Sequence, residues 1–433
     1  MAHFDPNSAA AGPLRTLEAL VRDAVAAFEP GFAVRLWTGE RLGPASGPMV
    51  TLNDPVALSR LVFRPRVETL VELWTQKAVD IEDGSILDIA ERRSTVRTRE
   101  AVRRFSKWRL ARALPSLFKL QRARPAQRSS IGDDAGLSGS TARAIQFHYD
   151  LSNRFYQTFL DDRMVYSCGY FDGWHDDIDR AQADKLEMIC RKLRLADGDR
   201  FLDIGCGWGA LLIHAASTRD VTAHGVTLSQ AQFDLSTERV AQAGLSDRVT
   251  IELKPFQKLT GRFDKIASIG MFEHVGFAHH DDYFRNVHKL LSPRGLYLHH
   301  AITRPAKASL KDFHKRRSRE YRALTKLIFP GGELDFVGHS AQKLEQHRFE
   351  VHDVENWREH YGRTCRLWTR RLEANFAAAV AEVGEPRARL WLLYLAGCAL
   401  SVERGTVMIN QTLASRRDKG PSGLPPTRAD LYR

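Results

Sequence analysis

FLDIGCGWGALLIHAA, residues 201–216, decides the fold of the second half of the chain. The stretch reads as a buried strand that ends in glycines and leads into a helix. Gly205, Gly207 and Gly209 allow the backbone to turn sharply and to approach a ligand at the helix N-terminus. These features predict a nucleotide-type ligand at the end of the strand.

The residues beside these glycines narrow the choice of ligand. Asp203 lies just ahead of the loop, and Ala210 holds the sixth position, where a dinucleotide-binding loop has glycine. Class I methyltransferases more often have this form. Their ligand S-adenosylmethionine has no pyrophosphate, and its positive sulfonium and amino groups suit a nearby carboxylate. The loop therefore favours a methyltransferase over a dehydrogenase.

Strand-like and helical runs alternate from residue 146 onward. Further strands are predicted at VTAHGVTL, VTIELK, FDKIASIG and GLYLHHAIT. Such alternation indicates a parallel, doubly wound sheet, so we expect an α/β, Rossmann-like class I methyltransferase fold. One common feature is missing, because the second strand ends in Thr227, Ser229, Gln230 and Gln232 rather than in an acid that would hold a ribose. Either a glutamine replaces that acid or the ribose is held elsewhere.

Length and composition set the outer limits. The chain has 433 residues and 43% hydrophobic residues, which indicates a globular protein of two domains. No apolar run approaches the length of a membrane span, and the first residues do not resemble a secretory signal. The five cysteines are scattered and form no CxxC pair, which favours a reducing cytosol over a disulfide framework or structural zinc. We expect no metal site.

The excess positive charge lies in one segment. Residues 92–128 contain 13 Lys or Arg and one acid, Glu100, a net +12 that equals the net charge of the whole chain. Such a segment suggests an anionic partner. We expect Val102, Phe105, Trp108 and Arg109 near one helix face, with Pro115 interrupting the pattern. The helix either packs its aromatic residues on a neighbouring domain or lies on a lipid surface.

These observations divide the chain into three parts. Residues 1–122 form a small N-terminal α/β accessory domain, with strands at FAVRLWTG and GPMVTLN and helices at PVALSRLVF and VETLVELWTQKAV. Residues 123–145 are rich in Gly, Ser, Ala and Pro and read as a linker. Residues 146–433 form the catalytic domain.

Eight motifs give a more specific identification. HYDLSNRFY, MVYSCGYF, KLEMICRKLRL, LDIGCGWG, GVTLSQAQ, MFEHVG, KLIFPGGEL and YGRTCRLW follow one another over roughly residues 146–415. In this order they resemble the cyclopropane-fatty-acyl-phospholipid synthase family, which includes the mycolic acid methyltransferases. The resemblance implies that the methyl group of S-adenosylmethionine is transferred to a cis double bond of a phospholipid acyl chain. Ring closure then needs a base that removes a proton from the added methyl.

The resemblance also assigns candidate catalytic residues. In this family the base is a bound bicarbonate ion, whose ligands here would be Cys168, Glu273, His300, the backbone of Ile302, and Tyr361. Because two anions are costly in a low-dielectric site, we infer that the bicarbonate hydroxyl donates to Glu273. Each residue also has a purely structural interpretation: a buried thiol, a helix cap, a core histidine or a packed tyrosine.

The cofactor site follows by the same comparison. Its predicted residues are Tyr166, Ser167, Asp203, Gly205, Gly207, Thr227, Gln232, Phe256 and Gln257, and Asp203 is expected to act without touching the cofactor. Phe256 could stack on the adenine ring. We interpret residues 148–173 as a cover over this site. Cys168 would face the bicarbonate and would not be a nucleophile, because this chemistry forms no covalent enzyme intermediate.

Several functional expectations remain open from the sequence. The same motifs fit a lipid methyltransferase that forms methyl branches without ring closure, because both products begin with one carbocation. A nucleic-acid methyltransferase is a distant alternative, since no recognition motif accompanies the basic segment. We expect an anionic phospholipid membrane surface as partner, a homodimer, no nucleic acid, and a cytoplasmic protein held peripherally at the inner face of the membrane.

Overall fold

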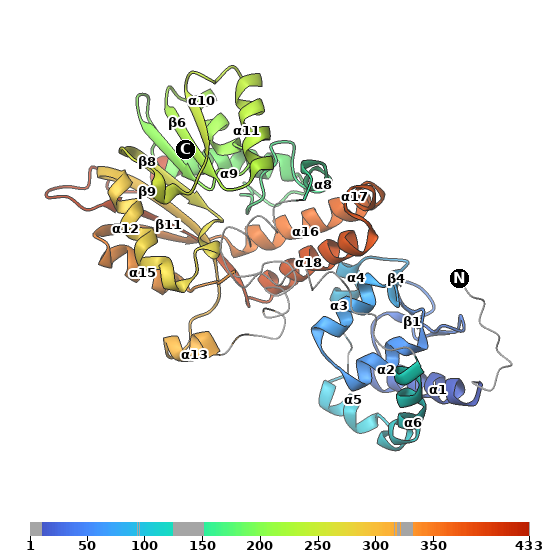
Figure 1. Cartoon of the computed structure of the whole chain (residues 1–433). Helices are drawn as coiled ribbons and strands as arrows, with labels where there is room; N and C mark the ends of the chain where they lie inside the picture. The colour runs from blue at the N-terminus through green and yellow to red at the C-terminus, as the bar shows by residue number, and fades with distance from the viewer. Residues whose placement is uncertain are drawn as a thin grey trace. The chain divides into compact units, whose positions relative to one another are not determined.

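The computed structural model describes residues 11–92, 94, 96–123, 151–315, 317, 321 and 332–432. The chain divides into two compact units (Figure 1). The described part of the first unit comprises residues 11–123 and Gly384–Ala396, and the second unit holds the remaining described residues. Apart from Ala123, the predicted linker at 123–145 lies outside the described residues.

The first unit is built on a four-stranded sheet in the order β2-β1-β3-β4. Strand β1 pairs with β3 in parallel, whereas β2 and β4 pair antiparallel at the two edges. Its elements are α1 (Ala11–Phe28), β1 (Ala33–Arg35), β2 (Arg41–Leu42), β3 (Met49–Leu52), α2 (Pro55–Phe63), α3 (Val67–Thr75), β4 (Val79–Glu82), α4 (Ile86–Glu91), α5 (Thr98–Arg104) and α6 (Lys107–Ala123). The two strands and two helices predicted from the sequence here are confirmed, and so is an accessory unit of α/β type.

The basic segment folds differently from the prediction. One helix was expected, with Val102, Phe105, Trp108 and Arg109 near one face. The segment instead forms two helices, α5 and α6, with Val102 in the first and Trp108 and Arg109 in the second. The break lies at Phe105, whose ring packs near Phe28, and at Ser106, whose amide donates to Asp23 at 2.9 Å instead of to a helical carbonyl. The predicted interruption at Pro115 was wrong, because α6 continues through the proline.

A second correction concerns residues 384–396, which the sequence assigned to the catalytic domain. They belong to the first unit because Arg389 is almost fully buried there. Its guanidinium donates to the backbone oxygens of Trp74 at 2.7 Å and Val79 at 3.3 Å, and pairs with Asp80 at 2.9 Å. It also stacks 3.9 Å from the centre of the Trp74 ring. These contacts fix the N-terminal part of α18 (Glu385–Glu403) within the accessory unit.

The second unit is a seven-stranded sheet with helices on both faces. Its strand order is β10-β11-β9-β8-β5-β6-β7, in which β11 runs antiparallel to both of its neighbours, β9 and β10, and the other six strands run in one direction. Its strands are β5 (Arg200–Ile204), β6 (Thr222–Thr227), β7 (Val249–Leu253), β8 (Phe263–Ile269), β9 (Leu291–Thr303), β10 (Phe349–Asn356) and β11 (Met408–Arg416). All five strands predicted from the sequence are confirmed, as is the doubly wound α/β fold.

Five helices of this unit cover the sheet in two layers (Figure 1). Helices α9, α10 and α11 cover one face of the sheet, and α12 and α15 cover the other. The helices are α8 (Asn153–Gln157), α9 (Ile178–Lys192), α10 (Ala210–Thr218), α11 (Gln230–Gln242), α12 (His280–Leu290), α13 (Leu310–Lys315), α15 (Val337–Gln346), α16 (Arg358–Ala374) and α17 (Phe376–Val383), with 3-10 turns η2 (Phe256–Lys258), η3 (Phe272–His274), η4 (Phe277–His279) and η5 (Ala429–Leu431). None of the described helices combines the length and apolarity needed to cross a membrane.

Each central strand contributes to two hydrophobic cores. In β5, Phe201 packs with the α9 and α10 side chains, whereas Leu202 and Ile204 pack with those of α12. In β9, Leu298 joins the first core and Tyr297 the second. A strand that is buried on both faces needs apolar residues at nearly every position, which explains the continuous apolar runs in the sequence.

Replacement of Arg389 tests whether residues 384–396 are part of the accessory unit. Arg389→Ala removes one side of a buried ion pair and the bonds to two backbone oxygens, so we expect a loss of about 3 kcal/mol in the free energy of unfolding. Urea unfolding followed by circular dichroism measures it. The matched variant Arg387→Ala removes an exposed arginine from the same helix and should change stability little. Equal effects of the two variants would contradict the packing described here.

Candidate active site

The glycine loop after β5 has a backbone that only glycine accommodates easily. The φ angles are +82° at Gly205, +55° at Gly207 and +81° at Gly209, which precedes α10. A Cβ atom at Gly205 would lie 2.9 Å from Cγ of Met271. The loop therefore turns back in the left-handed region and leaves the end of β5 open to a ligand.

A cavity opens at this loop, at the carboxyl ends of the parallel strands. It is lined by segments before α9, after β5, after β6, at η2 and after β8. All nine residues predicted to bind the cofactor line it together: Tyr166, Ser167, Asp203, Gly205, Gly207, Thr227, Gln232, Phe256 and Gln257. Ligands of α/β sheets bind at this edge, where the strand order reverses between β5 and β8.

The segment ahead of α9 packs against the glycine loop through aromatic rings. The indole Nε1 of Trp208, within the loop, donates to Oδ1 of Asn153 at 2.8 Å. The Trp208 ring also lies 5.0 Å from the ring of Tyr156, which lies 5.6 Å from that of Tyr166. The described part of the predicted cover thus borders the cavity. Trp208 was not singled out from the sequence, although its place inside the glycine motif was a usable signal.

The end of β6 shows how the cavity is formed without an acid. The hydroxyl of Thr227 donates to Oε1 of Gln232 at 2.8 Å, and the amide of Ser229 donates to the same hydroxyl at 3.2 Å. With its oxygen engaged, Gln232 presents its amide N–H groups as donors. Whether Gln232 holds the ribose in place of an acid stays a prediction from the sequence.

Lys185 is a candidate site residue that the sequence analysis did not identify. It is 2% exposed, lines the cavity, and donates from Nζ to the hydroxyl of Ser167 at 3.0 Å. Burial lowers the pKa of Lys185 to about 8, although Asp161, Cys168 and Asp203 oppose this. A signal was present, because Lys185 lies four residues after Ala181 and four before Ile189, on the apolar face of α9.

Asp203 lies in the same cavity wall with one oxygen free. Its Oδ1 is buried and has no hydrogen-bond partner among the described residues. Burial raises the pKa of Asp203 to about 7, and the positive charge of Lys185 lowers it only in part. The cavity therefore contains a carboxyl group whose charge responds readily to a cationic ligand.

Glu273 and Ile302 are brought together directly. Glu273, in η3 after β8, accepts a hydrogen bond from the backbone amide of Ile302 in β9 at 2.6 Å. Its other oxygen, Oε2, is buried and has no partner among the described residues. Burial raises the pKa of Glu273 to about 7, while the bond from Ile302 lowers it. A protonated Glu273 can donate from the free oxygen, and an ionised one can accept there.

His300 is held in one tautomer by its neighbours. Lys192 can only donate, and it does so to Oε1 of Gln411 at 2.7 Å. The amide nitrogen of Gln411 must therefore donate to Nδ1 of His300, 2.8 Å away. Burial lowers the pKa of His300 well below its usual value, so the ring is neutral and carries its proton on Nε2. That buried N–H has no partner among the described residues.

Cys168, the His300 ring and the backbone of Tyr361 have a common neighbour, Trp357. The His300 ring lies 5.5 Å from the Trp357 ring, the Cys168 sulfur lies 3.9 Å from the Trp357 oxygen, and the Tyr361 amide donates to that oxygen at 2.9 Å. Burial raises the pKa of both the Cys168 thiol and the Tyr361 hydroxyl, so both stay neutral. The sequence analysis did not identify Trp357.

The five predicted catalytic residues lie behind the cavity wall and are not among its lining residues. Two links connect them to it. The amide of Gly270, which lines the cavity, donates to the backbone oxygen of His300 at 2.9 Å. The positive charge of Lys185, also in the lining, lowers the pKa values of Cys168 and His300. The structure thus places a buried polar site directly beside the cavity.

The residues present fit both predicted small molecules. Asp203 offers an unpartnered carboxylate oxygen in a cavity formed by glycines, which suits the cationic S-adenosylmethionine. Beside it, His300 offers an unpartnered N–H donor and Glu273 an unpartnered carboxyl oxygen. This combination suits an oxyanion that accepts from His300 and donates a hydroxyl proton to Glu273, as bicarbonate can.

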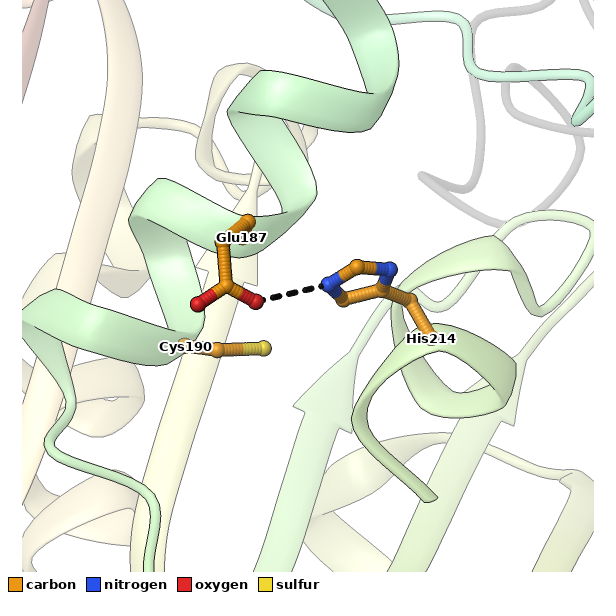
Figure 2. A group of neighbouring side chains, drawn as sticks. All are labelled: Glu187, Cys190 and His214. Atoms are coloured by element: carbon orange, nitrogen blue, oxygen red, sulfur yellow. Dashed lines mark hydrogen bonds and ion pairs between the residues drawn. The ribbon is translucent and has the colours of Figure 1, made fainter. Parts of the chain in front are cut away.

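A separate group of candidate metal ligands has another explanation. Glu187, Cys190 and His214 come within 4.8 Å of one another on α9 and α10 (Figure 2). Arg219 donates to both Glu187 oxygens, at 2.8 and 3.2 Å, while Nε2 of His214 lies 3.0 Å from Oε2. Burial raises the pKa of Cys190 to about 12, so its thiolate is unfavourable. An ion pair between helix and loop accounts for this group without a metal.

Comparison with known proteins agrees with this geometry. The mycolic acid cyclopropane synthetase family matches residues 138–412. A probable fatty acid methyltransferase of Pseudomonas putida is 35% identical over 411 residues, which cover 92% of this chain and 96% of that protein. Cyclopropane-fatty-acyl-phospholipid synthase of Escherichia coli K12 is 37% identical over 270 residues, which cover 62% of this chain and 66% of that protein.

Solved structures give the same result. Mycolic acid cyclopropane synthase CmaA1, crystallised with SAH and CTAB, covers 63% of this chain and 98% of its own length, with 33% identity and a TM-score of 0.59. The cyclopropane synthase MmaA2 from Mycobacterium tuberculosis has 31% identity and a TM-score of 0.60 over the same shares. These neighbours confirm the class I methyltransferase fold. The chain belongs to the mycolic acid cyclopropane synthetase family of S-adenosylmethionine-dependent lipid methyltransferases.

Proposed function

We propose that the protein transfers the methyl group of S-adenosylmethionine to the cis double bond of an unsaturated phospholipid acyl chain and closes a cyclopropane ring. One observation carries the proposal: Glu273 and His300 are both buried, each has an unpartnered polar atom, and each adjoins a lining residue of the glycine-loop cavity, Glu273 through the chain to His274 and His300 through the bond from Gly270. Ring closure needs a group that receives a proton, because a proton must leave the added methyl.

The chain's own residues have distinct roles in this scheme. An alkene carries no proton that must be removed before it attacks, so no strong base is needed at the methyl donor. Transfer of the methyl leaves a carbocation on the acyl chain, which water would quench. The Tyr166, Tyr156 and Trp208 rings pack together beside the cavity, and in this scheme they would keep water from the cation. Asp203 balances the positive charge that enters with S-adenosylmethionine.

Proton removal belongs to the polar site behind the cavity. Bicarbonate, when bound, would supply a basic oxygen there. His300 would donate to it from Nε2, in the tautomer that Gln411 and Lys192 enforce. Glu273 would accept its hydroxyl proton at Oε2, oriented by the bond from Ile302 to Oε1. Cys168 and Tyr361, both neutral and buried, would complete the wall of this site.

The Pseudomonas putida relative keeps a second candidate open. It is named a probable fatty acid methyltransferase and matches nearly the whole chain, including the accessory unit. A lipid methyltransferase that leaves a methyl branch would use the same cation and differ only in its later fate. The expected homodimer and the peripheral, cytoplasmic location at the membrane stay predictions from the sequence.

The product distinguishes these two functions. The purified protein is incubated with S-adenosylmethionine and unsaturated phospholipid vesicles, and the acyl chains are analysed by mass spectrometry. We expect chains that gain CH2 and lose the double bond. Retention of the double bond in a methylated chain would establish methyl branching instead, and absence of transfer to lipid would contradict both functions.

The role of Glu273 predicts a rescue by bicarbonate. Glu273→Gln keeps the bond from Ile302 but cannot accept the hydroxyl proton in the same way, so turnover should fall by about a hundredfold and recover in part with excess bicarbonate. The exposed Glu345→Gln serves as control. Unchanged turnover, or loss that bicarbonate does not relieve, would count against this role.

The same variant should alter the pH dependence of stability. The folded protein keeps the Glu273 proton up to pH about 7, whereas an ordinary glutamate loses it near its usual pKa of 4.5. Folding therefore binds an extra proton in this window, and stability should fall as pH rises through it. Thermal unfolding of Glu273→Gln, measured over the same pH range, should show a shallower fall than the wild type.

The charge of Asp203 predicts pH-dependent binding of S-adenosylmethionine. Because the pKa of Asp203 is about 7, its carboxylate forms as pH rises past neutrality, and the affinity for the sulfonium ligand should rise with it. S-adenosylhomocysteine lacks the sulfonium charge and should gain less. In Asp203→Asn the difference between the two ligands should shrink by about tenfold at alkaline pH, as measured by calorimetry. An unchanged difference would show that Asp203 does not sense the ligand charge.

A further inference from the structure

Helix α6 carries large apolar side chains on its outer surface. Trp108 is 69% exposed, Phe118 52% and Leu114 39%. Phe63 of α2, 37% exposed, packs edge-on 6.4 Å from Phe118 and extends the same surface. Single exposed apolar residues are common, but a group that includes a tryptophan and two phenylalanines marks an interaction surface. We call these four residues the aromatic patch.

The aromatic patch is additional to the core-packing face of α6. On the opposite side of the helix, Ala113 and Leu117 are fully buried. They pack against Leu14, Leu17 and Leu20 of α1. The helix therefore already has the apolar stripe that attaches it to the accessory unit. Trp108, Leu114 and Phe118 are not part of the core cluster that joins α6 to α1.

Basic side chains share the outward face with the patch. Arg112 follows Trp108 by four residues and its guanidinium lies 5.4 Å from the centre of the Trp108 ring. Arg122 stands in the same relation to Phe118, at 5.1 Å. Lys119 is also exposed, and α6 contains no acidic residue. Each aromatic ring is thus presented together with a cation, so the surface is apolar and positive at once.

We propose that the aromatic patch and its basic neighbours dock the protein on an anionic phospholipid bilayer. Aromatic and aliphatic side chains insert at the boundary between headgroups and acyl chains, while arginine and lysine reach the lipid phosphates. A nucleic acid fits less well, because Leu114 and Phe118 would remain against water or phosphate. The inference rests on the proposed function, because the patch would hold the protein on the membrane that contains the acyl substrate. Vesicle binding can nevertheless be measured without turnover.

Vesicle flotation of the full-length protein tests the proposal. One set of vesicles contains phosphatidylglycerol and the other only phosphatidylcholine, each at low and high salt. The wild type should bind the anionic vesicles at least about tenfold more tightly than the neutral ones, and salt should weaken that binding. Stronger binding to duplex DNA than to anionic vesicles at the same salt would overturn the proposal in favour of a nucleic-acid surface.

Two variants separate the apolar and the charged contributions. The double variant Trp108→Ser with Phe118→Ser should lose at least about tenfold in affinity for anionic vesicles. Its control, Leu70→Ser, removes another exposed apolar residue of the same unit. If the double variant binds as the wild type does, the patch is not the docking surface.

The charge variant replaces Arg112, Lys119 and Arg122 by Gln, and we expect it to lose about a hundredfold in affinity and most of its salt dependence. Its control replaces three exposed basic residues elsewhere in the unit, Arg15, Arg64 and Arg66, by Gln, and changes the net charge equally. An equal loss in this control would show general electrostatic attraction and contradict a specific surface.

The same variants distinguish failed docking from a failed functional proposal. Circular dichroism melting should show that both α6 variants fold as the wild type does, because the replaced side chains are exposed. Turnover of detergent-dispersed unsaturated phospholipid should also persist, since the cavity and polar site are intact. If the wild type transfers no methyl group to dispersed substrate, the proposed function is rejected. Vesicle binding would still test the docking surface.

Discussion

A single donor-only group determines the chemistry available behind the cofactor cavity. The Lys192 ammonium has protons to give and no lone pair to accept, so the Gln411 amide must turn its oxygen toward it. The amide nitrogen of Gln411 then faces His300 and donates to Nδ1, so the proton of the neutral imidazole must lie on Nε2. Without that constraint the neutral imidazole could present either an acceptor or a donor to the site. Because all three groups are buried, no water can take the place of a partner and change which group donates and which accepts.

Lys185 provides a second fixed charge, between the cavity and the polar site. It holds the Ser167 hydroxyl and influences the pKa values of Asp203, Cys168 and His300. The two carboxyl groups of the site, Asp203 and Glu273, both have pKa values near neutrality because they are buried with few partners. Two acids can therefore change charge near neutral pH: Asp203 under the influence of the Lys185 charge, and Glu273 under that of the backbone amide of Ile302.

The sequence predicted the parts of this arrangement that depend on local pattern. Apolar runs and glycine positions located all five predicted strands, and the family resemblance assigned the nine predicted cofactor residues, all of which line the cavity. Lys185, Gln411 and Trp357 were missed because their importance arises only where α9, β11 and the start of α16 meet. The break at Ser106 depends on Asp23, 83 residues away. The position of residues 384–396 likewise depends on a pairing with Trp74 that no local pattern indicates.

The accessory unit is formed by two separate stretches of the chain, and this limits which deletions the protein can tolerate. Its described residues come from both the start of the chain and Gly384–Ala396, so no single cut in the gene separates it. Removal of everything before the linker would leave the Arg389 guanidinium, which is almost fully buried, without Trp74, Val79 and Asp80. A shortened descendant would need new surface residues in the first turns of α18 before the deletion could be tolerated. Loss of the accessory unit therefore requires changes in the C-terminal sequence as well as deletion of the N-terminal one.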